Sequence, residues 1–352
     1  MRAELSLESA LIARRHAGRR YLVFIVLSAS VLILTFANLM IGAVSHPVGD
    51  VLRELVRPFT DSGTDLSFIV WKIRLPRALA TVMGGAYLAA SGLLLQVYFR
   101  NPVVGPYILG ISSGATLAVS LAMLTPLGLR LAYLTPFLTT LAGLAGAYLV
   151  MTLVVAVAAR VSSGATLLIV GLMTGYICSS VTAILTALAE KEKIKGFVLW
   201  GLGSFSGFKW LEIWIMLAFG GLLVLSIFLL SKPLNAFLLG EEYAASMGVS
   251  IRRFRLFILL AASSLAGLVT AMAGPVAFVG LAVPHMARLS LATSDNRVLI
   301  PGACLMGAIV TGACDLIART WLSPVELPIS AITAFFGAPV VIGLLLKRGV
   351  KM

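Results

Sequence analysis

The chain of 352 residues is 60% hydrophobic and only 12% charged, with a mean hydropathy of +1.03 and a formal net charge of +13. Soluble domains carry about 25% charged residues, so this composition excludes a water-exposed globular surface. A basic balance would suggest nucleic-acid binding in a soluble protein, but in a membrane protein it is explained by Lys and Arg in cytoplasmic loops. We therefore expect an all-α polytopic membrane protein that contacts lipid and binds no nucleic acid.

Apolar runs of about 20 residues, long enough to span a bilayer, recur from Tyr21 to the C-terminus. They predict a transmembrane domain at 21–347, between a polar segment at 1–20 and a tail at 348–352. Ten spans are expected, at 21–43, 78–98, 104–125, 132–158, 165–189, 209–231, 254–273, 276–292, 298–320 and 328–346. The Ala-Gly-Pro sequence at 273–275 divides one long apolar stretch into two spans, and Pro284 predicts a kink in the second.

Basic residues set the expected orientation, because Lys and Arg are enriched on the cytoplasmic side of membrane proteins. The N-terminal Arg cluster and the Arg-Arg-Phe-Arg sequence at 252–255 flank spans closely. With both placed inside, ten spans put both termini in the cytoplasm. The chain is then expected in the inner (cytoplasmic) membrane.

Arg74 and Arg77 fall on the outer side in this topology, at the start of the span 78–98. Pro76 suits the first turn of a helix, so both arginines are expected at a helix N-terminus, where the macrodipole disfavours cations. Basic residues on the outer side also oppose the topological rule. Two interpretations stay open: a functional role, or a structural pairing with lipid phosphate or with Asp61, Asp65 or Glu326.

Signatures of catalysis or metal binding are not found in the sequence. It contains no P-loop and no His-Glu-x-x-His motif, and its cysteines lie in apolar runs, where they are expected as buried hydrophobes. Asp315 and Arg319, four residues apart, predict an intrahelical ion pair. The chain is therefore not expected to be an enzyme.

The longest polar cytoplasmic stretch, 231–255, contains the sequence Gly-Glu-Glu-Tyr-Ala-Ala-Ser-Met-Gly at 240–248. Glu241 and Glu242 suit the first turn of a short helix, and Gly248 suits its C-cap. Such a helix beneath a membrane domain either rests on the surface or docks a soluble partner. Its mixed charges favour a protein partner over anionic lipid.

Six stretches in order from Arg74 to Lys347 carry a specific resemblance. They are RLPRALATVMGGAYLAASGLLLQ, RNPVVGPYILGISSGA, LWGLGSFSG, LGEEYAASMGV, GPVAFVGLAVPHMARL and ELPISAITAFFGAPVVIGLLL. Together they resemble the permease subunits of type II ABC importers for ferric siderophores, haem and vitamin B12.

The resemblance implies a homodimer with the pathway along the subunit interface. Two cytoplasmic ATPase subunits would bind beneath the loop 231–255, and one substrate-binding protein would dock outside. ATP and Mg would be bound by the ATPase, with no cofactor in this chain. The cargo expected for the family is an iron chelate, most commonly a ferric siderophore, with haem or cobalamin (vitamin B12) as alternatives, moved by alternating access.

The resemblance also assigns roles to residues. Arg74, Arg77 and Arg319 would meet acidic residues of the binding protein. The ATPase-coupling candidates are Gly240, Glu241, Ala244, Ala245, Gly248 and Val249. The helix at 165–189 resembles one that lines the pathway, which makes Met173, Tyr176 and Ser180 lining candidates. The basic outer loop 190–196 has no explanation from the family.

Two rivals come from other classes of protein. An ion-coupled secondary transporter would need intramembrane carboxylates, of which the sequence offers only Asp315. An intramembrane enzyme would need clustered His, Asp or Glu within the spans, and none is seen in the sequence.

Overall fold

The computed structural model describes residues 2–42, 44, 46–56, 65–125, 135–158 and 164–349, and the regular elements within these ranges are helices. Asp61 and the tail residues 350–352 lie outside them. The first half comprises α1 (Arg2–Met40), α2 (Val48–Val56), α3 (Asp65–Phe68), the π-helical turn η1 (Ile69–Arg74), α4 (Leu75–Phe99), α5 (Ile111–Leu124), α6 (Thr135–Ala158) and α7 (Gly164–Leu188). The second half comprises α8 (Lys191–Gly201), α9 (Trp210–Ile215), η3 (Met216–Gly220), α10 (Gly221–Leu229), α11 (Ser231–Leu239), α12 (Glu241–Ser246), α13 (Ile251–Ala273), α14 (Val279–Leu291), α15 (Asn296–Thr320) and α16 (Ile329–Gly349).

Seven helices in the described residues are long and apolar enough to cross a membrane. They are Gly18–Met40, Asp65–Phe99, Leu138–Val157, Thr166–Leu188, Trp210–Leu229, Ile251–Ala273 and Asn296–Thr320, and the shorter apolar helices are Ile111–Leu124 and Ile329–Gly343. The expected break at 273–275 is confirmed, since α13 ends at Ala273 and α14 begins at Val279.

Two of the expected spans are wrong in length. The stretch 104–125 is helical only from Ile111, because prolines at 102 and 106 and a left-handed Gly110 (φ +73°) hold the residues before it in turns. The stretch 276–292 yields only the 13 residues of α14, with Pro284 inside. At 1.5 Å per residue, α14 is about 20 Å long, shorter than the roughly 30 Å hydrocarbon core.

The helix carrying Arg74 and Arg77 begins earlier than predicted. The expectation of a helix N-terminus at Pro76 is wrong, because α3, η1 and α4 form one helical run from Asp65 to Phe99. Proline is tolerated there because the π-helical turn before it already departs from the regular i→i−4 pattern that proline would interrupt. Both arginines therefore lie inside a continuous helix.

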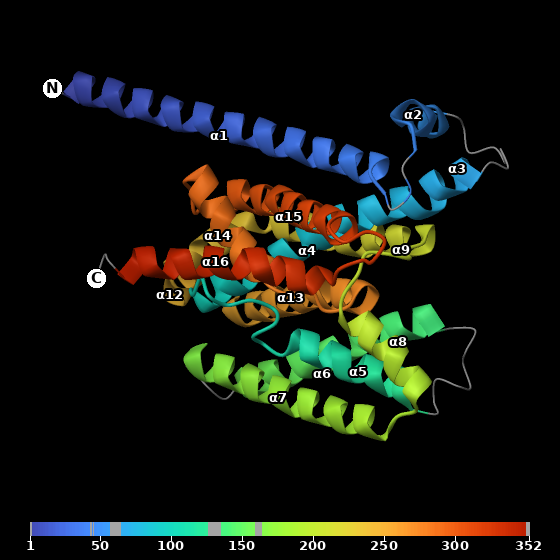
Figure 1. Ribbon diagram of the computed structural model, residues 1–352. Helices are drawn as coiled ribbons and strands as arrows, with labels where there is room; N and C mark the ends of the chain where they lie inside the picture. The colour runs from blue at the N-terminus through green and yellow to red at the C-terminus, as the bar shows by residue number, and fades with distance from the viewer. Residues whose placement is uncertain are drawn as a thin grey trace.

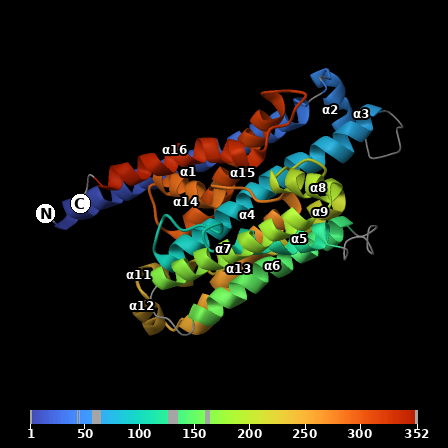
Figure 2. The same ribbon diagram turned by 60° about the horizontal axis from the view of Figure 1, so that its bottom comes forward.

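The helices form an elongated bundle with polar elements at its two ends (Figures 1 and 2). Both termini lie at the same end as α11 and α12, and α2, α3 and α8 lie at the opposite end. The runs Asp65–Phe99 and Ile251–Ala273 are the most buried of the seven candidate spans, which makes α4 and α13 the centre of the bundle. We call the end with α12 the coupling end and the opposite end the arginine end.

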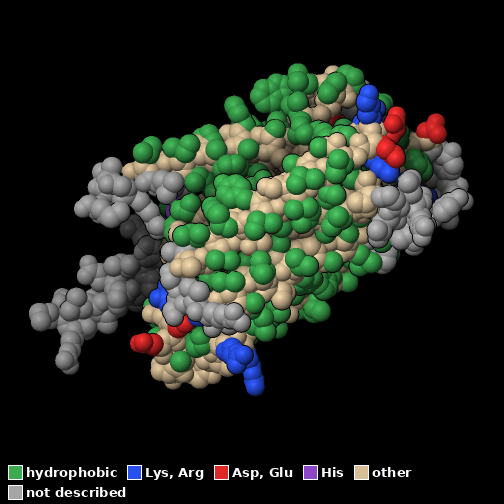
Figure 3. All heavy atoms as spheres, turned by 90° about the horizontal axis from the view of Figure 1, so that it is seen from below, with side chains coloured by type: hydrophobic (Ala, Val, Ile, Leu, Met, Phe, Trp, Pro, Cys, Tyr) green, Lys and Arg blue, Asp and Glu red, His purple; other side chains and the backbone are tan. Residues whose placement is uncertain are grey.

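One face of the bundle shows the surface expected of a protein embedded in lipid. Figure 3 shows apolar side chains covering its middle, with Lys, Arg, Asp and Glu gathered at the two ends. Large apolar side chains such as Leu149, Ile169 and Ile177 are exposed on the described chain. In water such a surface would aggregate, whereas hydrocarbon solvates it.

Glycines allow α4 to approach its neighbours closely. A Cβ atom on Gly85 would overlap the carbonyl oxygen of Gly307 in α15, and one on Gly92 would overlap the carbonyl oxygen of Gly280 in α14. Small residues at membrane helix crossings permit this backbone contact, which maximises dispersion energy where no hydrophobic effect operates. The α4–α15 crossing therefore depends on Gly85 and Gly307.

Hydrogen bonds near the arginine end join the turn at 203–204 to the end of α13 with the residues that follow it, and to the first turn of α16. The Ser204 N–H donates to the Ala273 carbonyl (2.8 Å), the Ser330 hydroxyl donates to the Pro275 carbonyl, and the Ile329 N–H donates to the Gly203 carbonyl (3.4 Å). Non-helical backbone inside a membrane protein needs such protein partners because lipid offers none. We call this set of bonds the backbone junction.

We predict that Gly85→Ala destabilises the protein by about 1–3 kcal/mol, because the added methyl group forces α15 away from α4. The measurement is thermal unfolding in detergent. Gly343→Ala is the matched control: Gly343 is also helical but has open space around it, so alanine should be neutral or stabilise by up to about 1 kcal/mol. Equal effects at the two positions would contradict the prediction.

Candidate functional site

The arginine end contains an ionic cluster formed by η1, α4, α15 and the segment before α16, and it is largely buried. We define the arginine cluster as Arg74, Arg77, Asp315, Arg319 and Glu326. It contains three cations and two carboxylates. The structure thus brings together all three arginines expected to dock a partner, and places each in contact with groups of its own chain.

Arg77 is the centre of the cluster. Its Nε donates to both carboxylate oxygens of Asp315 (3.2 and 3.1 Å), and its Nη2 donates to Asp315 Oδ1 (2.9 Å). Its Nη1 donates to Glu326 Oε1 at 2.7 Å. The side chain of Asp315 is 2% exposed, whereas that of Glu326 is 41% exposed. Arg77 is therefore held from the inside by a buried carboxylate and covered on the outside by a half-exposed one.

Arg74 caps the end of α1. Its Nη1 donates to the carbonyls of Leu39 and Met40 (both 2.9 Å), and its Nη2 donates to the Val44 carbonyl (2.6 Å). The last carbonyls of a helix lack intrahelical donors and carry partial negative charge, so a guanidinium is favourable there. The Arg74 interaction is therefore structural, and it fixes where α1 ends.

Arg319 binds the same end of α1 from α15. Its Nη2 donates to the carbonyl (2.8 Å) and the side-chain oxygen of Asn38, and the Asn38 amide donates to Gly312 in α15 (3.1 Å). The expected intrahelical pair with Asp315 is only a long contact, 3.9 Å from Arg319 Nε to Asp315 Oδ2. Asp315 turns to Arg77 instead, because that guanidinium presents two donors to one carboxylate.

The sequence indicates some of these partners and not others. Glu326 is among the structural partners that it suggests for the arginines, and its contact with Arg77 is observed. Asn38 is not among them, although an amide in the last turn of an apolar span is itself a signal, because polar groups there need partners. The roles of these arginines toward a binding protein stay a prediction.

The coupling candidates form the short helix that the sequence predicts. Glu241 and Glu242 lie in the first turn of α12, and Gly248 has φ +83°. The Val249 N–H donates to the Ala244 carbonyl (3.0 Å) and the Gly248 N–H to the Ala245 carbonyl (2.9 Å). This is the Schellman pattern, in which a left-handed glycine ends the helix. Gly240, with φ +135°, makes the sharp turn from α11 into α12.

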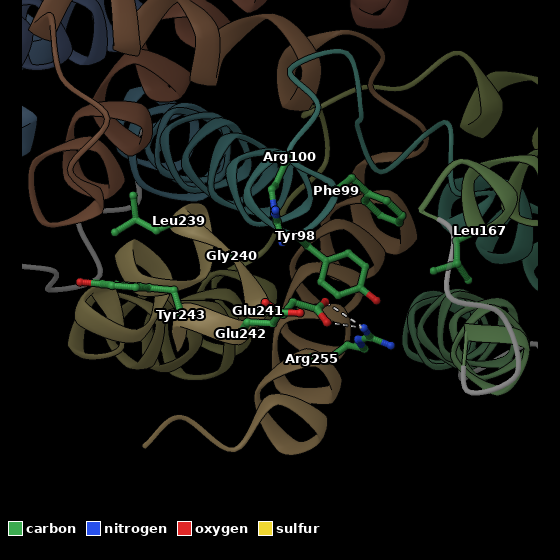
Figure 4. A pocket seen from close by; sticks show the side chains of 10 residues that line it. All are labelled: Tyr98, Phe99, Arg100, Leu167, Leu239, Gly240, Glu241, Glu242, Tyr243 and Arg255. Atoms are coloured by element: carbon green, nitrogen blue, oxygen red, sulfur yellow. Dashed lines mark hydrogen bonds and ion pairs between the residues drawn. The ribbon is translucent and has the colours of Figure 1, made fainter. Parts of the chain in front are cut away.

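A cavity of about 710 Å³ opens beside α12 (Figure 4). It is lined by the end of α4 (Tyr98, Phe99 and Arg100), by Leu167, by residues 239–243 and by Arg255. Arg255 donates to both oxygens of Glu241 (2.8 and 3.1 Å) and lies over the Tyr98 ring, 5.8 Å from its centroid. The ion pair joins α12 to α13 across 14 residues, and nothing in the sequence spacing indicates it.

The three lining candidates share one face of α7. Met173, Tyr176 and Ser180 follow at helical spacing and are all exposed, Tyr176 to 60%. The opposite face, with Gly171, Thr174 and Gly175, is buried, and Gly171 and Gly175 pack against the backbone of residues 109–110. The single chain therefore leaves this face of α7 uncovered.

The basic segment 190–196 is not a loop. It forms the start of α8, in which Lys191 and Lys195 are exposed and Lys193 pairs with Glu190 at 3.4 Å. Phe197 is buried and stacks on Trp200 with ring centroids 6.0 Å apart. Alternating Lys and Glu stabilise a short solvent-exposed helix through pairs three or four residues apart. These charges therefore lie in a helix where the sequence predicts a loop.

The sequence matches a known family of transport proteins. Residues 30–347 match the model of the FecCD transport family. The chain belongs to the FecCD transport family. The vitamin B12 import system permease protein BtuC of Salmonella typhi is 36% identical over 335 residues, which cover 95% of this chain and 98% of that protein. The corresponding protein of Salmonella newport shows the same identity and coverage.

A solved structure of a transporter has the same fold as this chain. An inward-facing conformation of a metal-chelate type ABC transporter matches with a TM-score of 0.79 and 28% identity, over 93% of this chain and 99% of that one. The protein is therefore an all-helical ABC importer permease subunit, a transport component and not an enzyme.

We predict that Asp315→Ala destabilises this FecCD permease by about 3–5 kcal/mol, because it leaves Arg77 buried without its main counter-ion. Glu326→Ala should cost no more than about 1 kcal/mol, since that carboxylate is partly solvated. Thermal unfolding of both variants in detergent provides the comparison. A larger loss for Glu326→Ala would show that the buried pair is not the main stabilising contact.

A second prediction concerns the turn that ends α12. Gly248→Val should disrupt the Schellman turn, since left-handed backbone costs roughly 1–2 kcal/mol for residues other than glycine and more for β-branched ones. Amide hydrogen exchange of residues 244–249 should therefore speed up. Gly248→Asn is the matched control, because asparagine tolerates this conformation. Unchanged protection in the valine variant would contradict the assignment.

Proposed function

We propose that two copies of this FecCD permease form the pathway of an ATP-driven importer that moves a metal chelate inward by alternating access. The observation that carries the proposal is the near full-length match to vitamin B12 permeases and to a metal-chelate transporter. The architecture supports it: an apolar bundle has a helix suited to a soluble partner at one end and a cluster of arginines at the other.

The uncovered face of α7 supports a homodimer. Met173, Tyr176 and Ser180 place a mixed apolar and hydroxyl surface on the outside of the single chain. In a dimer with α7 at the interface, these residues would line a passage between the two protomers. A wall of this composition suits a large chelate, because it offers contact without strong retention.

The coupling end is proposed to receive the ATPase. Gly240, Glu241, Ala244, Ala245, Gly248 and Val249 define α12 and its two turns, and the Glu241–Arg255 ion pair connects them to α13. A partner that displaces α12 would therefore also displace α13, which is one of the candidate membrane spans. ATP and Mg would belong to that partner. Both termini share this end, so the proposal places them in the cytoplasm and the protein in the inner membrane.

The arginine end is proposed to receive the substrate-binding protein. Arg74 and Arg319 are committed to α1, which leaves Arg77 as the arginine whose partner on one side, Glu326, is partly exposed. A carboxylate of the binding protein could reach Arg77 only where Glu326 moves aside. Such charges act mainly on encounter rate and register.

Three chelates are candidate cargoes. The family resemblance favours a ferric siderophore, with haem as an alternative, whereas the two Salmonella relatives at 36% identity are named as vitamin B12 import permeases. We propose a metal chelate as the cargo class, with ferric siderophore, haem and cobalamin as the candidates to be separated by experiment.

The decisive experiment is uptake into proteoliposomes that contain the permease, its cognate ATPase and binding protein, with no ion gradient. Radiolabelled ferric siderophore, haem and cobalamin are offered in parallel. ATP-dependent, vanadate-sensitive uptake of one chelate would establish the function and the cargo. Uptake that needs an ion gradient and no ATPase would instead establish the secondary transporter.

We predict that Glu326→Gln raises the affinity of the permease for the binding protein several-fold. The reason is that Arg77 Nη1 loses its charged internal partner and becomes available to a carboxylate of the binding protein. Glu190→Gln is the matched control: it removes the same charge from the same end but leaves Arg77 unchanged. Binding is measured with the permease in nanodiscs. Equal affinities of the two variants would contradict docking at Arg77.

A further inference from the structure

We call α11 and α12, with the turn between them, the coupling segment (Ser231–Ser246). It has a second anchor in the membrane domain, at the start of α15. The side-chain amide of Asn235, in α11, donates to Asp295 Oδ1 at 2.6 Å. The side-chain oxygen of Asn235 accepts from both the backbone and the side-chain nitrogen of Asn296, each at 2.8 Å. One side chain thus joins the element before α12 to the first two positions of another helix.

Asp295 and Asn296 are built into the start of α15. Asp295 is the N-cap of that helix, and its side chain accepts from the Arg297 N–H at 3.0 Å. Asn296 is completely buried. Burial acts to raise the pKa of Asp295, but the bonds from Asn235 and Arg297 and the nearby arginine charges outweigh it and hold the pKa below its usual value. The carboxylate is therefore charged at neutral pH, and its bond from Asn235 is charge-assisted.

The far end of α15 holds the arginine cluster. Asp315 binds Arg77 in α4, and Arg319 binds Asn38 in α1. Asp295 lies at the start of α15, which is one continuous helix of 25 residues with Pro301 inside it, about 37 Å long in all. Among the described residues, hydrogen bonds from α15 reach α11 at one end and the arginine cluster at the other, and α4 runs between the same two places, with Tyr98 stacked on Phe237 of α11 and with Arg77 in the cluster.

The other anchor of the coupling segment does not lead to the same place. The Glu241–Arg255 ion pair attaches α12 to the start of α13, and α13 ends at the backbone junction. An α-helix resists compression along its axis, so a displacement applied to one end of the helix also moves the other end. Asn235 therefore connects the coupling segment to the helix that reaches the arginine cluster, whereas Glu241 connects it to the helix that reaches the backbone junction.

We propose that Asn235 is a positioning residue that ties the coupling segment to α15, and that α15 carries displacements of that segment to the arginine cluster. The proposal rests on the proposed function, in which an ATPase contacts α12 and a binding protein contacts the cluster. Nucleotide binding to the ATPase at the coupling end then changes the affinity of the binding protein at the arginine end. Because coupling is reciprocal, the binding protein changes the affinity for nucleotide by the same factor.

The test measures this linkage in the complete permease–ATPase complex in nanodiscs. The affinity of the binding protein that supports uptake is determined without nucleotide and with ATP plus vanadate, and the ratio of the two affinities is the coupling factor. Such factors are typically about 5–150-fold. Asn235→Asp should reduce the factor to below about twofold, because it sets a second carboxylate against Asp295 and removes the amide donor.

The double variant N235D/D295N is the decisive control. It restores a carboxylate–amide pair with its polarity reversed, the carboxylate introduced at position 235 still accepts from Asn296, and asparagine remains a good N-cap. The coupling factor should return to within about twofold of the original value. Ser226→Ala, which removes only a bond within α10, should leave the factor unchanged.

Each outcome separates the inference from the proposed function. A coupling factor retained in Asn235→Asp, or not restored in the double variant, overturns the role of Asn235. If Asn235→Asp does not assemble with the ATPase, Asn235→Ala, which removes the bonds without adding charge, takes its place under the same criteria. Absence of any nucleotide effect in the unsubstituted complex overturns the proposed function instead.

Discussion

The ion pair between Arg77 and Asp315 is the interaction on which the arginine end depends. Both groups are buried, so each needs the other to remain charged away from water, and three hydrogen bonds fix the guanidinium against the carboxylate. The pair joins α4 to α15 on the arginine-end side of their glycine crossing. With α15 placed, Arg319 and Arg74 can reach the end of α1, and the cluster becomes a single unit.

The parts of the fold that follow from local chemistry were predictable from the sequence. The membrane class, the short helix α12 with its glycine terminator and the break after α13 depend on composition and on glycine or proline at single positions. The partners of the arginines were mostly not predictable, because Arg77 and Asp315 lie 238 residues apart and meet only through packing. The early start of the α4 run and the short α14 depend on π-helical geometry and on neighbouring helices, which spacing does not reveal.

The two ends of the bundle are built from different chemistry, and α15 connects them. At the arginine end, guanidinium groups bind carbonyls and carboxylates that are largely removed from water. At the coupling end, the joining groups are amides and ion pairs at the edge of the membrane domain. Breaking the deeply buried Arg77–Asp315 pair would leave uncompensated charge away from water, whereas the Glu241–Arg255 pair at the other end is partly exposed and can exchange its bonds for bonds to water.

The backbone junction has a consequence for how the molecule changes shape. Segments 203–204, 273–275 and 329–330 satisfy one another's main-chain groups, and any sliding between them would strand polar atoms in a region without water. These three segments therefore hold one another in place, and a change of shape that keeps their hydrogen bonds would move the end of α13 and the start of α16 together.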